Sequence, residues 1–172
     1  MQNFRRLETL NNLAIVKIPA VRYKEGSIQE ITEPVVVEDK ITLYLNGKKY
    51  ITMVATNDSL TELGAGFFVA AGIAKRILTV TVDGTDVFVF LYDVICVDGA
   101  LESAGGFDPG HAESVSANDA RITPDEIFAI REALNGDAWG ETGGLHCTVL
   151  YHRHEQAAVF SDIGRHNTVD KA

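Results

Sequence analysis

Two polar motifs near the end of the chain could together build one anion-binding site. The first is Thr142-Gly143-Gly144, followed by Leu145-His146-Cys147, and the second is the run DIGRHNTVDK from Asp162 to Lys171. Paired glycines allow positive φ, and their N–H groups can line an anion-binding concavity. Asn167 is a good N-cap, so we expect a helix from Thr168 whose positive dipole end lies beside Arg165. These residue types favour a phosphate or another oxyanion.

A short hairpin is expected to bring the two motifs together. Residues 145–150 and 157–161 favour β-structure, and the polar stretch 152–156 suits the connecting loop. Antiparallel pairing would place the 142–144 turn, which enters the first strand, beside residues 162–167, which leave the second. Each motif alone is also typical of an ordinary Gly-rich turn or helix cap, so a purely structural interpretation stays open.

The motifs TGGLH and DIGRHNTVDK, separated by a hairpin, resemble the paired signature of the FdhD family, the accessory sulfurtransferases of molybdenum formate dehydrogenases. The upstream EP, NG and LGAGFFVAAGI segments are also similar to the family pattern, so the resemblance covers about residues 30–171. It implies a cytidine-deaminase-like three-layer α/β sandwich, with a mixed sheet built from hairpins and with flanking helices.

The resemblance also implies a function. Sulfur would pass from a cysteine desulfurase to the molybdenum bis-guanine-dinucleotide cofactor of formate dehydrogenase, so the ligand would be this cofactor or a guanine nucleotide. Carried over by position, the binding residues are Thr142, Gly143, Gly144, His146, Gly164, Arg165, His166 and Asn167. Asp162 and Asp170 would orient Arg165 and cap the helix.

The cysteines that carry sulfur in the family are missing. The family has a Ser-Cys-Gly-x-Cys-Gly loop where this chain has ESAGGF at 102–107, and a persulfide needs a thiolate. Cys147 is a candidate catalytic substitute because His146 and Arg165 could lower its pKa, although a strand cysteine is more often inert. Cys96 has apolar neighbours in the sequence, so we interpret it as a small buried hydrophobic residue. Three hypotheses stay open: a cofactor-sulfurating protein, a binding module without sulfur transfer, and a purely structural relative.

Metal and hydrolytic sites are not indicated. His111-Ala112-Glu113 matches the H-x-E motif of zinc nucleobase deaminases, but the Pro-Cys-x-x-Cys that supplies their other ligands is absent. His152 and His154 could join Cys147 or His166 only through an extended loop, and no tight metal-ligand spacing supports a zinc site. No nucleophile elbow or Walker loop is present.

Composition sets broad limits. The chain has 172 residues, of which 46% are hydrophobic and 23% charged, so residues 1–172 are expected to form one domain. A net charge of −9 argues against nucleic-acid and anionic-membrane partners. The lack of a membrane-length apolar run or signal peptide favours the cytoplasm, where Cys96 and Cys147 would be free thiols. Members of the FdhD family continue with a second half of similar length. We therefore expect this chain to correspond to the front portion of such a protein, with a ligand pocket that a second copy in a homodimer could complete.

The remaining pattern predicts the elements that must position the motifs. We expect a strand at 13–18, a polar connection at 23–31, and a hairpin of 41–45 and 50–55 around a type I′ Asn-Gly turn. A buried helix should span 59–72 behind a Ser59–Glu62 capping box. A second hairpin, 77–82 with 87–97, precedes a long loop and a capped helix at 124–134. Trp139 could be a lid over the candidate site or a packing anchor. The helix expected from Thr168 would be too short to bury a face.

Overall fold

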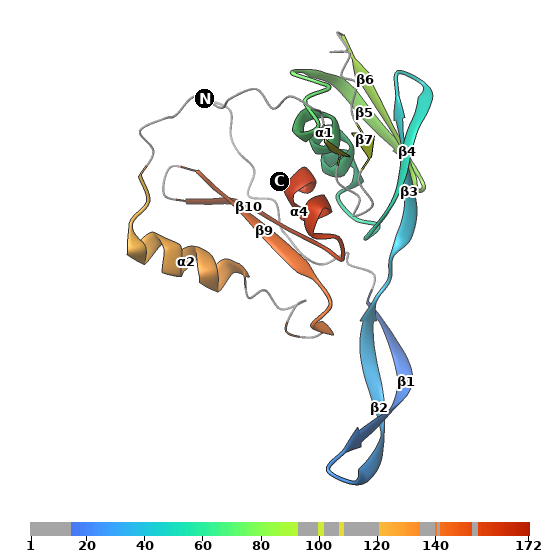
Figure 1. The fold of residues 1–172 in the computed structure, drawn as a ribbon, viewed down its shortest axis with the longest axis vertical. Coiled ribbons are helices and arrows are strands. Elements are labelled where there is room, and N and C mark those ends of the chain that lie inside the picture. The colour runs from blue at the N-terminus through green and yellow to red at the C-terminus, as the bar shows by residue number, and fades with distance from the viewer. Residues whose placement is uncertain are drawn as a thin grey trace.

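The computed structural model describes residues 15–92, 100–101, 107–108, 121–134, 140, 142–152 and 155–172. Its elements, labelled as in Figure 1, are β1 (Ile15–Lys24), β2 (Ser27–Val36), β3 (Asp39–Leu45), β4 (Lys48–Ala55), α1 (Leu60–Ala70), β5 (Ile77–Asp83), β6 (Asp86–Leu91), β7 (Ala100–Leu101), β8 (Phe107–Asp108), α2 (Pro124–Leu134), β9 (His146–His152), β10 (Glu155–Asp162) and α4 (Arg165–Lys171). None of these helices is long and apolar enough to cross a bilayer.

A mixed four-stranded sheet carries the core. The strand order is β4-β3-β6-β5, with β3 and β6 parallel and the other neighbours antiparallel. Asn46 and Gly47 both have positive φ, as a type I′ turn requires, so the first predicted hairpin is confirmed. In the second hairpin the loop is Gly84-Thr85 and only Gly84 has positive φ, which fits a type II′ turn. The predicted α/β class with a mixed sheet is therefore confirmed.

Helix α1 covers one face of that sheet. Its Leu63 and Phe68 are fully buried against Leu43, Val87 and Val89 of the two central strands. Alternation along β6 leaves Val87, Val89 and Leu91 buried and the residues between them half-exposed, as expected for a strand with one core face. The helix is confirmed, but its predicted capping box is wrong. Ser59 adopts a left-handed conformation, and its hydroxyl donates to Asp58 Oδ2 and accepts no hydrogen bond from a helix N–H.

Two glycines let α1 approach its neighbours on both sides. A Cβ on Gly64 would lie 2.5 Å from Val87 Cγ1 and 3.2 Å from Val89 Cγ2, so glycine there allows close packing on the sheet. A Cβ on Gly66 would overlap the carbonyl oxygen of Asp170 in α4. The two helices therefore cross with their backbones in contact.

The C-terminal elements stack beyond α1. Helix α4 packs on α1 and on the β9–β10 hairpin, and α2 packs on β9 and β10, so the helices α1 and α4 separate the sheet from the hairpin (Figure 1). Thr168 and Lys171 are buried at the α4 contact. The expectation that the last helix begins at Thr168 and buries no face is wrong, because it begins at Arg165 and lies between two other elements.

Other predicted elements are only partly confirmed. Residues 15–36 form a long β1–β2 hairpin through Pro19 rather than one strand and a polar connection. The 124–134 helix is confirmed with its capping box, in which Thr123 N and Oγ1 donate to Glu126 Oε2 at 2.7 and 2.8 Å. In this helix Ile127 and Leu134 are exposed. Within the predicted long loop, β7 pairs with β8. Residues 93–97 of the second hairpin lie outside the described residues.

The helix crossing predicts a strong effect at one glycine. Replacing Gly66 with alanine should destabilise the protein by about 1–3 kcal/mol despite the better helix propensity of alanine, because backbone atoms of Asp170 cannot yield as a side chain can. Urea unfolding measures this, with the exposed Thr61→Ala in the same helix as the matched control, expected within about 0.5 kcal/mol of wild type. A stable Gly66→Ala protein would contradict the close crossing.

Candidate functional site

A fully buried ion pair lies at the centre of the C-terminal motif. The Asp162 carboxylate and the Lys171 ammonium are each sealed from solvent, with Asp162 Oδ2 2.8 Å from Lys171 Nζ. The same oxygen accepts hydrogen bonds from Thr56 N at 3.1 Å and Thr56 Oγ1 at 2.9 Å. Burying two charges carries a large desolvation cost unless their remaining hydrogen-bonding groups are satisfied. Here no described buried polar side chain is left without a partner.

The second oxygen of Asp162 fixes the turn into α4. Asp162 Oδ1 accepts from Gly164 N at 2.7 Å and from Asn167 Nδ2 at 2.9 Å, and Asn167 Nδ2 also donates to Val54 O at 2.9 Å. Asn167 is therefore not the N-cap that the sequence suggested, because Gly164 holds that position. A Cβ on Gly164 would lie 2.6 Å from Asn167 Nδ2, so these two predicted binding residues pack on each other.

Lys171 ties the C-terminal helix to the loop between β4 and α1. Its Nζ donates to Thr56 Oγ1 at 2.8 Å and to Asp58 Oδ1 at 3.0 Å, with longer contacts to the carbonyl oxygens of Ser161 and Thr56. Thr56 and Asp58 had no assigned role in the sequence. They are more than 100 positions from Asp162 and Lys171, and no local pattern marks such a contact.

The β9–β10 register brings the two motifs to one end of the hairpin. His146 pairs with Asp162 and Cys147 with Ser161, so the 142–144 turn and the Arg165–Asn167 segment leave the hairpin at the same end. The predicted hairpin is thus confirmed, and both motifs leave it at the same end.

Several side chains at this end face solvent. His146, Arg165 and His166 are exposed, and among the described residues Arg165 has no ion-pair partner. Gly143 has positive φ, and no atom lies within 4 Å of where its Cβ would be. Gly144 N donates a long hydrogen bond, 3.4 Å, to Thr142 Oγ1. This end therefore offers a cation, two imidazoles and open glycine backbone to a ligand.

Cys147 lies in a different environment from the one expected. Its side chain is half-buried, and desolvation raises the pKa of the thiol above its usual value, an effect that a hydrogen bond with Ser161 only partly opposes. The predicted lowering of its pKa by His146 and Arg165 is therefore not found. Thiols with raised pKa are poor nucleophiles near neutral pH.

Asp170 lies four positions after His166 in α4. Burial raises the pKa of Asp170 to about 6, and the opposing effect of His166 is smaller. This carboxyl group therefore gains protons as the pH falls toward 6, which would make the surroundings of His166 less negative.

The described residues do not support the alternative hypothesis of a metal site. There, no group of three or more His, Cys, Asp or Glu side chains is placed to hold a metal ion. His111, Glu113, His154, Cys96, Trp139 and the 102–106 part of the ESAGGF segment lie outside the described residues.

The FdhD/NarQ family model matches residues 36–172. The chain belongs to the FdhD/NarQ family. It is 26% identical over 173 residues to the sulfur carrier protein FdhD of Shouchella clausii, covering 87% of this chain and 65% of that protein. The FdhD of Bacillus subtilis is 25% identical, with coverages of 90% and 68%, and that of Staphylococcus aureus is 29% identical, with 89% and 65%. The chain thus spans about two thirds of the length of these curated relatives.

A solved structure supports the fold. The crystal structure of a candidate formate dehydrogenase accessory protein from Desulfotalea psychrophila superposes with a TM-score of 0.67 at 24% identity. The match covers 91% of this chain and 64% of that one. The α/β architecture is therefore shared with an FdhD-like protein, and this likeness concerns the fold alone.

The buried pair of this FdhD-family chain predicts an asymmetric mutational effect. Lys171→Met should cost about 3–5 kcal/mol, because Asp162 keeps a buried and unpaired charge, whereas adding Asp162→Asn should restore part of that loss. Chemical denaturation of the single and double variants checks this. Lys40→Met, on an exposed β3 position, is the control and should stay near wild type. A single variant as stable as the control would show that the pair does not hold α4.

Proposed function

We propose that this chain is an accessory protein of formate dehydrogenase maturation that binds the molybdenum bis-guanine-dinucleotide cofactor through its guanine nucleotide phosphates. The observation that carries the proposal is that the 142–144 turn and the Arg165–Asn167 segment leave the β9–β10 hairpin at the same end. Relatives are sulfur carrier proteins named FdhD. The partners that follow are a formate dehydrogenase and, where sulfur is supplied, a cysteine desulfurase.

The donor set fits a phosphate-rich cargo. Arg165 supplies a planar guanidinium suited to bidentate contact with phosphate oxygens, and its charge is not neutralised by a described neighbour. Gly143 and Gly144 leave their backbone open to close approach. The nearest buried carboxylate, that of Asp162, is already paired with Lys171 and cannot repel an anion as a free carboxylate would. In a chain of net charge −9, such a local cationic surface is the place where an anion can dock.

Each predicted binding residue then has a role suited to its position. Arg165, His146 and His166 would contact the ligand, because their side chains reach solvent. Gly164 and Asn167 would act by holding the α4 start, because their polar groups are engaged with Asp162. Thr142 would shape the glycine turn through its contact with Gly144 N.

The residues of this chain support sulfur transfer less well than they support cofactor binding. A persulfide needs a thiolate, yet the family's two loop cysteines are replaced and the pKa of the Cys147 thiol is raised by burial. Binding without transfer is accordingly the function that we favour.

Guanine nucleotide binding tests the proposal. Arg165→Ala should weaken binding of GDP at least tenfold by loss of a charge-assisted contact, about 1.4 kcal/mol or more, whereas Cys147→Ala should leave it unchanged. Isothermal titration at fixed low salt measures both. Arg131→Ala, which removes an exposed arginine from α2, is the matched control. An equal loss of GDP affinity in the Arg165 and Arg131 variants would indicate a general charge effect and contradict the proposal. If the wild-type protein binds no GDP, the hypothesis of a purely structural relative is the one that remains.

A second candidate, cofactor sulfuration, depends on the position of Cys147 one residue from His146 at the same end of the hairpin. It predicts a mass increase of one sulfur atom on Cys147 after incubation with a cysteine desulfurase and cysteine. Mass spectrometry of wild type and Cys147→Ala measures this directly. If Cys147 stays unmodified at high desulfurase concentration, this second candidate function is contradicted, and the nucleotide-binding proposal is unaffected.

A further inference from the structure

Strand β4 forms an open edge of the four-stranded sheet. The strand order places β4 at one end, where it pairs with β3, and among the described elements β3 alone packs on it extensively (Figure 1). An edge strand presents N–H and C=O groups with which a further strand can pair. The β4 edge is therefore a candidate surface for an added strand, provided that its backbone groups are not already bonded.

Hydrogen bonds of the neighbouring strand show which backbone groups of β4 point outward. Thr42 N donates to Thr85 O at 2.9 Å, so the backbone groups of Thr42 face the β6 side and not β4. Thr52, which is opposite Thr42, is consequently in a non-hydrogen-bonded pair, where side chains come close, and the two hydroxyl oxygens lie 3.3 Å apart. The N–H and C=O of Thr52 therefore point away from β3, into the open edge.

Val54 points in the same direction. Its carbonyl oxygen accepts a hydrogen bond from Asn167 Nδ2 at 2.9 Å, from outside the sheet. Backbone direction alternates along a strand, so Thr52 and Val54 face the same way. Within the described part of the chain, Thr52 N, Thr52 O and Val54 N have no hydrogen-bond partner. Three neighbouring groups of the edge can thus bind an added strand, which would end beside the start of α4.

Two lysines lie on one face of the hairpin beside this edge. Opposite residues share a face of a sheet, so Lys40 lies on the face of Val54, and Lys49 on the face of Tyr44. Lys40 and Tyr44 are four positions apart on β3, which puts both pairs on the same face. Residues 41 and 43 point to the other face and are buried in the core with α1. The lysines therefore lie on the face that α1 does not cover.

The β3–β4 hairpin is a cationic part of an acidic chain. Residues 39–55 contain three lysines and one aspartate, whereas the whole chain has a net charge of −9. Lys40, Lys48 and Lys49 are exposed, and within the described residues none of them has an ion-pair partner. Asp39 instead accepts a hydrogen bond from Asn57 Nδ2 at 3.0 Å. Charge complementarity therefore favours an acidic strand at this edge.

The same lysines oppose pairing between two β4 edges. Lysine on an edge strand protects a sheet against joining a like edge, because a second copy would bring the same charges together. An acidic strand meets no such repulsion. The charge pattern thus selects a segment of a different protein as the occupant.

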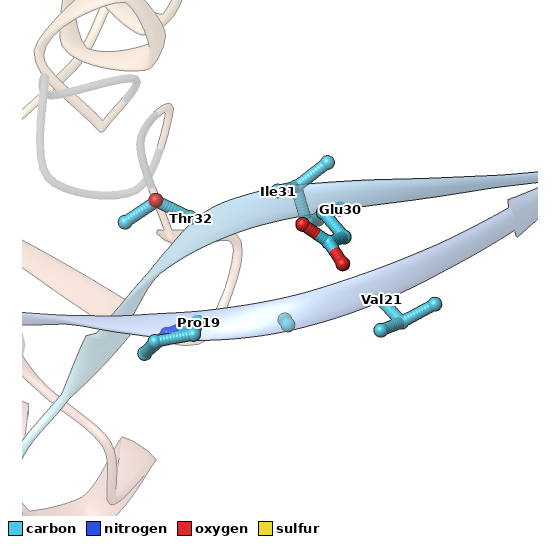
Figure 2. A pocket seen from close by; sticks show the side chains of 6 residues that line it. Pro19, Val21, Glu30, Ile31 and Thr32 are labelled. Carbon is cyan, nitrogen blue, oxygen red and sulfur yellow. The ribbon is translucent and has the colours of Figure 1, made fainter.

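The other open strands suit an acidic strand less well. Strand β5, at the far edge of the sheet, has Asp83 as its one charged residue. In the β1–β2 ribbon, Pro19 in β1 and Pro34 in β2 each remove an amide donor. The hollow on that ribbon, shown in Figure 2, is lined in part by Glu30, which would repel an acidic strand. Of these described edges, β4 combines unbonded backbone groups with cations.

We propose that the β4 edge binds an extended acidic segment of a partner protein as an additional strand. Hydrogen bonds to Thr52 and Val54 would supply main-chain affinity, and Glu or Asp at alternate positions would contact the lysines of the hairpin. The intervening positions would be apolar, because they would lie next to Ile51 and Met53, which pack against the core. The proposal goes beyond nucleotide binding and does not depend on it.

A synthetic peptide tests the charge selection. The probe is a terminally blocked peptide of alternating valine and glutamate, as long as the eight residues of β4, with alternating valine and lysine as its control. Isothermal titration at low salt should give a dissociation constant below about 1 mM for the acidic peptide and no measurable binding of the basic one. Wild-type protein that does not bind the acidic peptide, or that binds both peptides equally, overturns the proposal.

Two charge-reversal variants locate the binding. Lys40→Glu/Lys49→Glu should weaken binding of the acidic peptide by about tenfold or more, because it replaces both cations of the face. The matched control is Lys17→Glu/Lys24→Glu, which makes the same charge change at exposed positions of the ribbon and should stay within about twofold of wild type. An equal loss in both variants would indicate a general charge effect and overturn the proposal.

Amide hydrogen exchange tests the strand geometry in the full wild-type chain. Saturating acidic peptide should slow exchange of the Thr52 and Val54 amides by about fivefold or more and leave the β5 edge unchanged. Peptide binding without protection of Thr52 and Val54 would mean a contact through side-chain charge alone. Protection of β5 instead would place the added strand on the other edge, and either result overturns the proposal.

Discussion

The buried pairing of Asp162 with Lys171 is the constraint on which the C-terminal half of this protein depends. Removing both charges from water is costly, so the pair persists only because neighbouring groups complete it. Thr56 donates twice to Asp162 and also contacts Lys171 Nζ, which makes the loop after β4 part of the same unit. A buried pair of this kind is weak evidence for high stability. It is better evidence for a unique arrangement, because few other placements of α4 would satisfy both ions.

This constraint divides the DIGRHNTVDK motif into a buried and an exposed part. Asp162, Thr168 and Lys171 are sealed inside, whereas Arg165 and His166 lie on the outside of the same short helix. Because the inner charges neutralise each other, they do not cancel the outer ones. The buried residues of the motif thus anchor a helix, and Arg165 is presented at the end of the hairpin where the glycine turn also lies.

Local signals predicted the elements, and long-range contacts decided the details that the sequence could not give. The Asn46-Gly47 turn and the Thr123–Glu126 capping box were correctly predicted because each depends on residues within four positions. Asn167 was misassigned as an N-cap because its amide is held by Asp162 and by Val54, 113 positions away. The capping box at Ser59 failed for a related reason, since the loop conformation there places Asp58 against Lys171. The length of the strands in residues 15–36 was underestimated because polar and apolar residues do not alternate regularly there.

In this chain the proposed anion binding and any sulfur chemistry would depend on different residues. The described contacts that hold the start of α4 do not involve a cysteine: they join the Asp162 carboxylate to the Lys171 ammonium, Thr56 and Asn167. Cys147 lies on the half-buried side of β9, next to an exposed His146, since successive strand residues face opposite ways. A thiol at this position faces the interior, where burial keeps it protonated. Replacement of the loop cysteines would thus remove a route for sulfur without disturbing the framework that positions Arg165, so the proposed anion binding does not require the sulfur chemistry.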